Sequence, residues 1–360
     1  MAHRSSLYEL HRSLGATFQE VRGWDLPGRY QDPIQEHRAI RESVGLLDLS
    51  FRALYHVTGS ERTRFLNGLL TNDINKLEEG QGCYTCLLTP QGKILADPEV
   101  YALRDYHLLE LDAHCKEQAL DHLNKYIIAD DVAFEELEDH TLLALQGPAA
   151  TTLLQRLLPG TALPPGEQRC VELTLDDHPC RVIQGSITGE EGYKIVTPRE
   201  RAANVWQALQ AAGATPVGMA ALNALRLEAG IPWFGVDFDE GNFPQEAGIE
   251  DRALNFTKGC YIGQEFVIRI AHRGHVNRRT SGLTMQHEPI PRSGDRVLRG
   301  EKEVGRITSA ALSPTLGKII GLGMLRRESQ EPGTVVQIER NGESVPAEVT
   351  PLPFYRRATG

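Results

Sequence analysis

The sequence predicts an α+β fold in which two sheet-and-helix blocks are followed by a small β-barrel. Three observations support this prediction. The chain has 360 residues, of which 41% are hydrophobic, so it exceeds the size of a single core. Segments with helical and strand-like spacing alternate over most of its length. After Arg279 the sequence changes to short β-rich runs broken by Gly and Pro, which is typical of a barrel of about 80 residues.

The first block begins with a helix and a strand and continues into a hairpin. Pro33–Val44 has apolar residues at helical spacing, and Ser60 is a candidate N-cap for a second helix. Two strand-like runs flank Thr89-Pro-Gln-Gly-Lys93, whose Pro and Gly suit a hairpin turn. The predicted elements are helices at 33–44, 63–70 and 116–126, and strands at 53–58, 83–88, 94–103 and 108–111.

The second block repeats this pattern and ends in a helix of unusual composition. Its predicted elements are strands at 141–145, 181–184 and 192–196, and helices after Gly147-Pro148 and at about 200–212. Pro216–Gly230 is apolar except for Arg226 and Glu228. We expect a largely buried helix here, so both charges need partners.

Composition excludes several classes of function. The formal net charge of −10 argues against nucleic acid or an acidic membrane surface as a partner. No run approaches the ~18 apolar residues of a membrane span. The six cysteines have no regular spacing, so we expect reduced thiols rather than a disulfide framework, in a cytoplasmic protein. No set of residues with metal-ligand spacing is visible, and no metal is expected.

Cys260 is the most distinctive single residue. Lys258 lies two positions away, and Gln264-Glu265 follow as the start of an expected helix. A positive neighbour and a helix N-terminus both lower the pKa of a thiol and increase the thiolate fraction. The alternative is a buried, inert cysteine. The residues alone leave both interpretations open.

Two acidic positions are further candidates. Asp97 follows the hairpin turn and precedes Pro98, so it either caps a turn or faces a pocket beside Tyr84 and Tyr101. In a pocket it would act as an acid, a base or an orienting group for a bound amine. Thr188–Tyr193 reads as an acidic turn or as a source of a carboxylate for an amino-heterocycle. The basic residues of 272–279 could contact the carboxylates of an anionic ligand tail.

Several patches, taken together and in order, resemble the glycine-cleavage T-protein superfamily. The segment Lys258-Gly-Cys-Tyr-Ile-Gly-Gln-Glu265 followed by Arg269 resembles the signature of its YgfZ branch, which is related to iron–sulfur assembly factors. The superfamily resemblance rests on Val44-Gly-Leu-Leu-Asp-Leu-Ser50, Leu70-Thr-Asn-Asp73, Leu145-Gln-Gly-Pro148, Thr188-Gly-Glu190 with Gly192-Tyr193, and Leu225-Arg-Leu-Glu-Ala-Gly230.

The resemblance implies a fold, a ligand and a set of site residues. The fold is a folate-binding region of two interlocked sheet-and-helix subdomains at 1–275 and a β-barrel domain at 276–360. The ligand is tetrahydrofolate. The implied cofactor-binding residues are Tyr84, Asp97, Tyr101, Asp112, Glu190 and Arg226. The implied catalytic residues are Cys260, Asp97 and Lys258.

Three positions depart from the T-protein pattern. Lys194 stands where the superfamily has the acid that anchors the pterin, Ile187 where it has a tyrosine, and Asp112 where it has an asparagine. An ammonium offers no acceptor to the amino group of a pterin. These departures weigh against T-protein chemistry.

The function expected from these resemblances is folate-dependent support of iron–sulfur cluster assembly or repair through Cys260. One alternative is a tetrahydrofolate-dependent one-carbon transferase, either an aminomethyltransferase or a demethylase. A second is a non-catalytic folate-binding scaffold or sensor. The expected partners are folate and iron–sulfur proteins, with no nucleic acid and no membrane, and the chain is expected to be a monomer.

Overall fold

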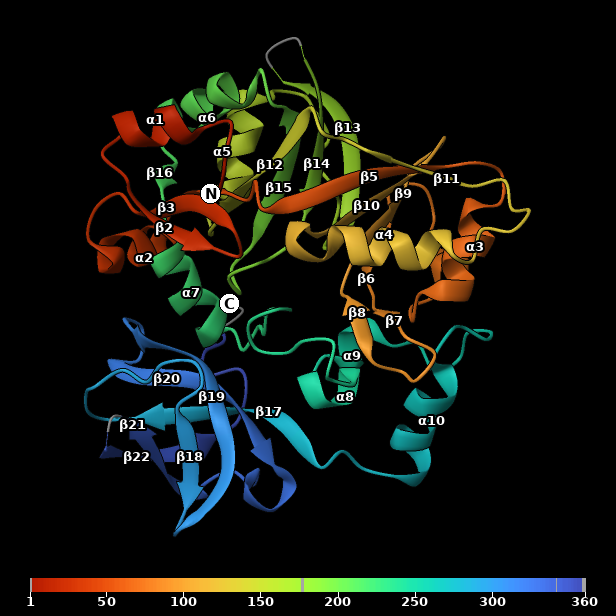
Figure 1. The fold of residues 1–360 in the computed structure, drawn as a ribbon. Coiled ribbons are helices and arrows are strands. Elements are labelled where there is room, and N and C mark those ends of the chain that lie inside the picture. The colour runs from red at the N-terminus through yellow and green to blue at the C-terminus, as the bar shows by residue number, and fades with distance from the viewer. Residues whose placement is uncertain (1, 176–177, 341, 358–360) are drawn as a thin grey trace.

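The computed structural model describes residues 2–175, 178–340 and 342–357. Figure 1 shows two sheets with their helices in the upper half of the molecule and a barrel below them. The predicted α+β fold with a C-terminal barrel is therefore confirmed. Among the described residues, no helix is both long enough and apolar enough to cross a membrane.

The first sheet has five strands in the order β11-β5-β10-β9-β6. Helices α3 and α4 cover it, and apolar side chains from both layers form one core. The bounds are β5 (Arg52–Thr58), β6 (Gly82–Tyr84), β9 (Glu99–Ala102), β10 (His107–Asp112), β11 (Ala133–Glu136), α3 (Arg62–Leu69), α4 (Lys116–Asn124), η1 (Ile74–Lys76) and η2 (Ala113–Cys115).

The second sheet has six strands in the order β13-β14-β15-β12-β4-β16. The bounds of its strands and helices are β4 (Gly45–Asp48), β12 (His140–Gln146), β13 (Arg169–Leu175), β14 (His178–Gln184), β15 (Gly192–Pro198), β16 (Thr215–Pro216), α5 (Ala150–Leu157), α6 (Ala202–Ala211) and α7 (Met219–Glu228). The N-terminal segment adds a small three-stranded sheet, with β1 (His3–Arg4), β2 (Thr17–Val21), β3 (Trp24–Arg29), α1 (Tyr8–Ser13) and α2 (Pro33–Glu42).

The two sheets share a core and are interlocked, as the resemblance implied. Strand β4 belongs to the second sheet, and the chain crosses into the first sheet at β5 after three residues. A core cluster between the sheets combines Leu47 of β4, Tyr101 of β9, Leu142 of β12 and Leu222 of α7. Burying these apolar faces against each other fixes the relative position of the two sheets.

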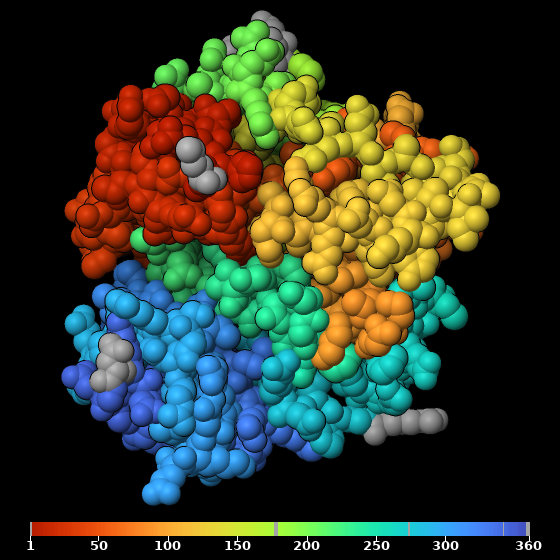
Figure 2. Space-filling view, viewed as in Figure 1, coloured from red at the N-terminus to blue at the C-terminus, as the bar shows by residue number. Residues whose placement is uncertain are grey.

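The predicted hairpin is divided into two parts. Strand β7 (Leu87–Leu88) pairs with β8 (Ile94–Ala96), whereas β6 pairs with β9. The break falls at Asp97-Pro98 on one side, because Pro98 has no backbone N–H to donate to a ladder. Gly92 at the tip lies against Phe266. Figure 2 shows this orange hairpin in contact with the cyan segment that precedes the barrel.

The last third of the chain forms a helical connection and a closed barrel. Strands join in the order β17-β20-β19-β18-β21-β22 around an apolar core. The bounds are α8 (Pro244–Ala247), α9 (Glu250–Ala253), α10 (Gln264–Arg273), β17 (Arg278–Met285), β18 (Arg296–Arg299), β19 (Lys302–Ser313), β20 (Lys318–Arg326), η3 (Arg327–Ser329), β21 (Val335–Arg340) and β22 (Glu343–Thr350).

Helix α7 joins the second sheet to the barrel. As predicted, its two charges are buried and paired: Arg226 pairs with Asp237 and donates to Ser309 of β19, at 2.6 Å. Glu228 accepts hydrogen bonds from His37 at 2.9 Å and from Ser313 of β19. These contacts attach the barrel to the folate-binding region expected from the sequence.

Candidate functional site

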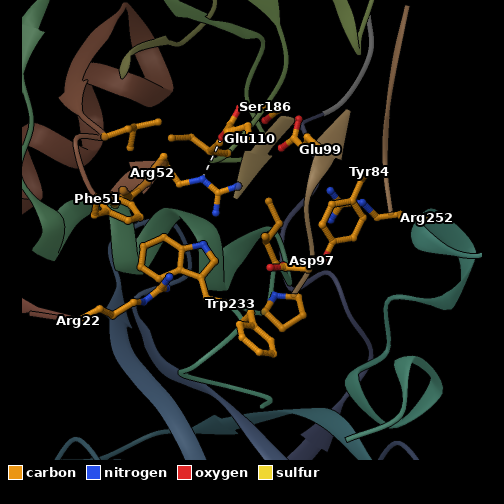
Figure 3. A pocket seen from close by; sticks show the side chains of 16 residues that line it. Arg22, Phe51, Arg52, Tyr84, Asp97, Glu99, Glu110, Ser186, Trp233 and Arg252 are labelled. Atoms are coloured by element: carbon orange, nitrogen blue, oxygen red, sulfur yellow. Dashed lines mark hydrogen bonds and ion pairs between the residues drawn. The ribbon is translucent and has the colours of Figure 1, made fainter. Parts of the chain in front are cut away.

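A cavity lies where the first sheet, the N-terminal hairpin and the segment after α7 meet. The empty space between its walls, counted out to the open solvent at its mouth, is about 740 Å³. Figure 3 shows its lining side chains. They are Arg22, Leu49, Phe51, Arg52, Tyr84, Asp97, Glu99, Glu110, Ser186, Ile187, Leu222, Ile231, Pro232, Trp233, Phe234 and Arg252.

Asp97 lies at the centre of this cavity, and the break between β8 and β9 positions it there. One carboxylate oxygen, Oδ2, accepts a hydrogen bond from the Tyr84 hydroxyl at 2.9 Å. The other, Oδ1, is buried and has no hydrogen-bond partner among the described residues. Burial raises the pKa of Asp97, and Arg52, Tyr84 and Arg22 offset part of this effect. The free oxygen can accept a hydrogen bond from a ligand amine or exchange a proton with it.

A buried network of two acids and two cations forms one wall. Lys194 of β15 donates to Glu99 at 2.9 Å and to Glu110 at 2.5 Å, and Arg52 donates to Glu110 at 2.9 Å. Tyr101 donates to Glu99 behind this wall. Burial acts to raise the pKa of Glu99, but Lys194 and Tyr101 outweigh it and lower the pKa to about 2.

This network places Lys194 behind its acidic partners and outside the cavity lining. Its side chain is 2% exposed and both of its acidic partners line the cavity, whereas Lys194 itself does not. The expectation that an ammonium faces the ligand is therefore corrected. The cavity presents carboxylate oxygens on this wall, because Lys194 neutralises Glu99 and Glu110 from behind.

The opposite wall comes from the N-terminal hairpin and the segment after α7. Arg22 occupies the turn between β2 and β3, and its guanidinium carbon lies near the neighbouring rings of Phe51 and Trp233, 5.7 and 5.0 Å from their centroids. It donates to Asp112, which also accepts from the ring of His114 at 2.6 Å. Asp112 thus holds Arg22 in place and does not itself line the cavity.

Arg252 of α9 marks the exposed edge of the cavity. Its guanidinium carbon lies 4.9 Å from the centroid of the Tyr84 ring, and its side chain is exposed. The sequence analysis did not select Arg22, Arg52, Glu99, Glu110, Trp233 or Arg252. A signal existed only for Glu99 and Glu110, which are charges within otherwise apolar strand runs.

Four of the six residues implied to bind the cofactor lie outside the cavity lining: Tyr101 and Asp112, described above, and Glu190 and Arg226. Glu190 is buried against Arg41, at 2.6 Å, and Arg357 of the C-terminal segment, also at 2.6 Å. Arg226 is used by Asp237 and Ser309 at the barrel junction. Glu190 and Arg226 are each paired with a charged partner.

Cys260 and Lys258 also lie outside the cavity lining. The Lys258 ammonium donates to the backbone carbonyls of Asn67, Leu70 and Asn72 at 2.6–2.7 Å, which uses all three of its N–H groups. Burial lowers the pKa of Lys258 to about 8. Cys260 is exposed, and helix α10 has its N-cap at Gly263, so the thiol lies outside the first helical turn.

The basic residues of 272–279 were expected to contact the carboxylates of an anionic ligand tail. Two of them form ion pairs with acids at the barrel junction instead. Arg278 pairs with Glu246 at 3.2 Å and Arg279 with Glu250 at 2.6 Å. Within the described part of the chain, no group of three or more His, Cys, Asp or Glu residues is arranged to hold a metal ion.

Comparison with known proteins gives matches over nearly the whole chain. Residues 7–258 match the GCVT N-terminal domain, and residues 278–356 match the glycine cleavage T-protein C-terminal barrel domain. An aminomethyltransferase of Rubrobacter xylanophilus is 35% identical over 98% of this chain and 94% of its own length. One of Thermosynechococcus vestitus is 34% identical over 98% of this chain and 96% of its own length.

Solved structures lead to the same family. The crystal structure of the glycine cleavage system aminomethyltransferase T from Bartonella henselae has a TM-score of 0.91 with this chain and 28% sequence identity, covering 99% of both chains. The narrower resemblance to the YgfZ branch stays a prediction. By its two matched domains, its full-length relatives and its fold, the chain belongs to the glycine-cleavage T-protein family.

Proposed function

We propose that this protein is a tetrahydrofolate-dependent one-carbon transferase of the aminomethyltransferase type. The observation that carries the proposal is Asp97, a buried carboxylate in an open cavity, one oxygen of which has no hydrogen-bond partner among the described residues. The names of the full-length relatives support the same activity. This was an alternative in the sequence analysis, where Lys194 weighed against it. That objection loses its force because Glu99 and Glu110, not Lys194, line the cavity.

The cavity suits a pterin with its attached aryl ring. An aminopyrimidinone edge donates N–H groups and accepts at its carbonyl oxygen. Glu99 and Glu110 offer carboxylate oxygens, and Arg52 between them offers N–H groups. Phe51, Trp233 and several aliphatic residues supply flat and apolar walls. The cavity therefore combines a few polar groups that fix orientation with a large apolar surface.

Asp97 would handle the proton at the reacting nitrogen. Tetrahydrofolate supplies a nucleophilic nitrogen that accepts the one-carbon unit. The free Oδ1 of Asp97 can orient that nitrogen and stabilise positive charge on it. Tyr84 holds the other oxygen and so fixes the plane of the carboxylate. Because burial raises the pKa of Asp97, its carboxyl group exchanges protons more readily near neutral pH than an exposed aspartate does.

The test separates binding from chemistry. Tetrahydrofolate is titrated calorimetrically into the wild type and Asp97→Asn, and formation of methylene- or methyl-tetrahydrofolate is measured with aminomethyl and methyl donors. Asp97→Asn keeps the shape of the side chain, so we expect the dissociation constant to change by less than about threefold while the transfer rate falls by roughly 10²-fold or more. A wild type that does not bind tetrahydrofolate, or a variant with full turnover, would contradict the proposal.

Two other hypotheses remain distinct from this one. Folate-dependent support of iron–sulfur assembly or repair stays a prediction, as do iron–sulfur proteins as partners. Its structural support is the exposure of Cys260, although Lys258 is directed to backbone carbonyls. Cys260→Ala should abolish that role and leave one-carbon transfer intact. The non-catalytic scaffold is favoured if the wild type binds tetrahydrofolate but forms no product with any donor.

A further inference from the structure

Arg22 enters the cavity from an unusual backbone position. It lies in the turn between β2 and β3 with φ of 50°, a left-handed conformation that non-glycine residues seldom adopt. Its side chain is only 9% exposed. The rings of Phe51 and Trp233, whose centroids are 6.4 Å apart, both lie close to the guanidinium, 5.7 and 5.0 Å from its carbon. Figure 3 shows this arrangement beside the Trp233 indole.

One edge of this guanidinium is without a partner. Nη1 donates to Asp112. Nε and Nη2 are both buried, and neither has a hydrogen-bond partner among the described residues. These two nitrogens carry parallel N–H groups on the same edge, which is the arrangement that binds the two oxygens of a carboxylate. Buried donors without partners are rare in native proteins, so this edge points to a ligand.

None of the described acids near Arg22 accepts a hydrogen bond from its Nε–Nη2 edge. Asp112 is shared with His114, and Asp237 is occupied by Arg226. Burial and the nearby Arg52 lower the pKa of Arg22 to about 10, so it still carries its charge at neutral pH. An incoming carboxylate would therefore satisfy the unpartnered edge.

We propose that the Nε–Nη2 edge of Arg22 binds a carboxylate of the one-carbon donor, so that the donor is a small methylated or aminomethylated acid. This inference rests on the proposed function, because it names the substrate class of the same site. The charge of Asp97 reaches Arg22, and both residues line one cavity. A donor held at Arg22 would thus lie beside the carboxylate assigned to the reacting nitrogen.

A folate tail is the other source of carboxylates. It must leave the cavity toward solvent, and Arg252 is the exposed cation at the edge of the cavity. Figure 3 shows Arg22 and Arg252 on opposite sides of Asp97. The buried position of Arg22 therefore favours the donor over the tail.

The test compares two probes that share a trimethylammonium group. Glycine betaine has a carboxylate where choline has a hydroxymethyl group. Binding of each is measured calorimetrically to the wild type, Arg22→Gln and Arg22→Lys, and tetrahydrofolate is titrated separately. Arg22→Lys keeps the charge beside Asp112 but removes the two parallel N–H groups of the guanidinium. Arg252→Gln is the matched control at the cavity edge. Thermal unfolding confirms that each variant is folded.

We expect the wild type to prefer glycine betaine over choline by about tenfold or more. Arg22→Gln should abolish this preference, Arg22→Lys should retain part of it, and Arg252→Gln should leave it unchanged. The dissociation constant of tetrahydrofolate should change by less than about twofold in both Arg22 variants.

Two results would overturn the assignment. One is equal binding of the two probes by the wild type. The other is an Arg22→Gln variant that loses tetrahydrofolate affinity but keeps the preference for betaine, because Arg22 would then bind the folate. Failure of the proposed function would give a different result. In that case the wild type would not bind tetrahydrofolate, but it would still prefer betaine through Arg22, and the carboxylate subsite would stand.

Discussion

Replacing Lys194 with methionine tests whether the buried charge network is held together as described. The Lys194 ammonium lies 2.9 Å from Glu99 and 2.5 Å from Glu110, and its side chain is 2% exposed. With an effective dielectric constant of about 20, one charge pair at 2.9 Å contributes ~6 kcal/mol. Desolvation of the ions cancels much of this, and breaking a buried pair costs about 3–5 kcal/mol overall. We expect Lys194→Met to lose that amount of unfolding free energy at pH 7.

The loss should depend on pH. In the wild type the folded-state pKa of Glu99 is about 2, below its ordinary value of 4.5. Its contribution to stability is therefore complete above pH 4.5 and is lost as the pH falls toward 2. Without Lys194, burial dominates and raises the pKa of Glu99 above its ordinary value, so charging this group in the variant opposes folding. The difference between wild type and variant should then grow from about pH 4 to pH 7.

Urea unfolding followed by tryptophan fluorescence at pH 4 and pH 7 measures both effects. Lys116→Met is the matched control, because Lys116 forms a 2.6 Å pair with Glu136 but is 32% exposed. Its loss should cost less than about 1 kcal/mol. The double variant Lys194→Met with Glu110→Gln should regain part of the stability. A Lys194→Met variant as stable as the wild type, or one with an equal loss at both pH values, would refute the reasoning.

Three further predictions concern other contacts. Tyr84→Phe removes the hydrogen bond that lowers the pKa of Asp97, so the acidic limb of the rate–pH profile should move to higher pH, as measured by initial rates. Arg226→Met leaves Asp237 buried without its partner and should cost about 3–5 kcal/mol in urea unfolding; a cost below 1 kcal/mol would contradict the described pairing. Lys258→Met leaves three backbone carbonyls without their donor and should cost about 2 kcal/mol or more, with faster hydrogen exchange in residues 67–72 as the local readout; unchanged exchange there would count against this role.

Local patterns in the sequence were sufficient to predict much of the fold. The change to short β-rich runs after Arg279 predicted the barrel. The apolar composition of Pro216–Gly230 predicted a buried helix, and burial in turn predicted partners for its two charges. The hairpin around residue 90 was predicted as one pair of strands. It is divided at Asp97-Pro98, where Pro98 has no backbone N–H to continue the ladder, and its two halves pair separately. That division is what directs Asp97 into the cavity.

Asp97 and Tyr84 could be selected from the sequence because one hairpin brings them together, 13 residues apart. Other parts of the cavity depend on contacts between distant segments. Lys194 lies 84 residues from Glu110, and Arg22 lies 90 residues from Asp112. Nothing in the local pattern around either residue shows which partner its charge meets.

The sequence by itself determined the fold class, the superfamily and the central carboxylate, since these follow from periodicity and from motifs in fixed order. Only the tertiary structure decided which charges face the ligand. Lys194 and Arg22 carry the same formal charge, yet Lys194 is neutralised behind Glu99 and Glu110, whereas one edge of Arg22 has no partner among the described residues. Burial makes that difference large, because a charge removed from water must find its partners within the fold.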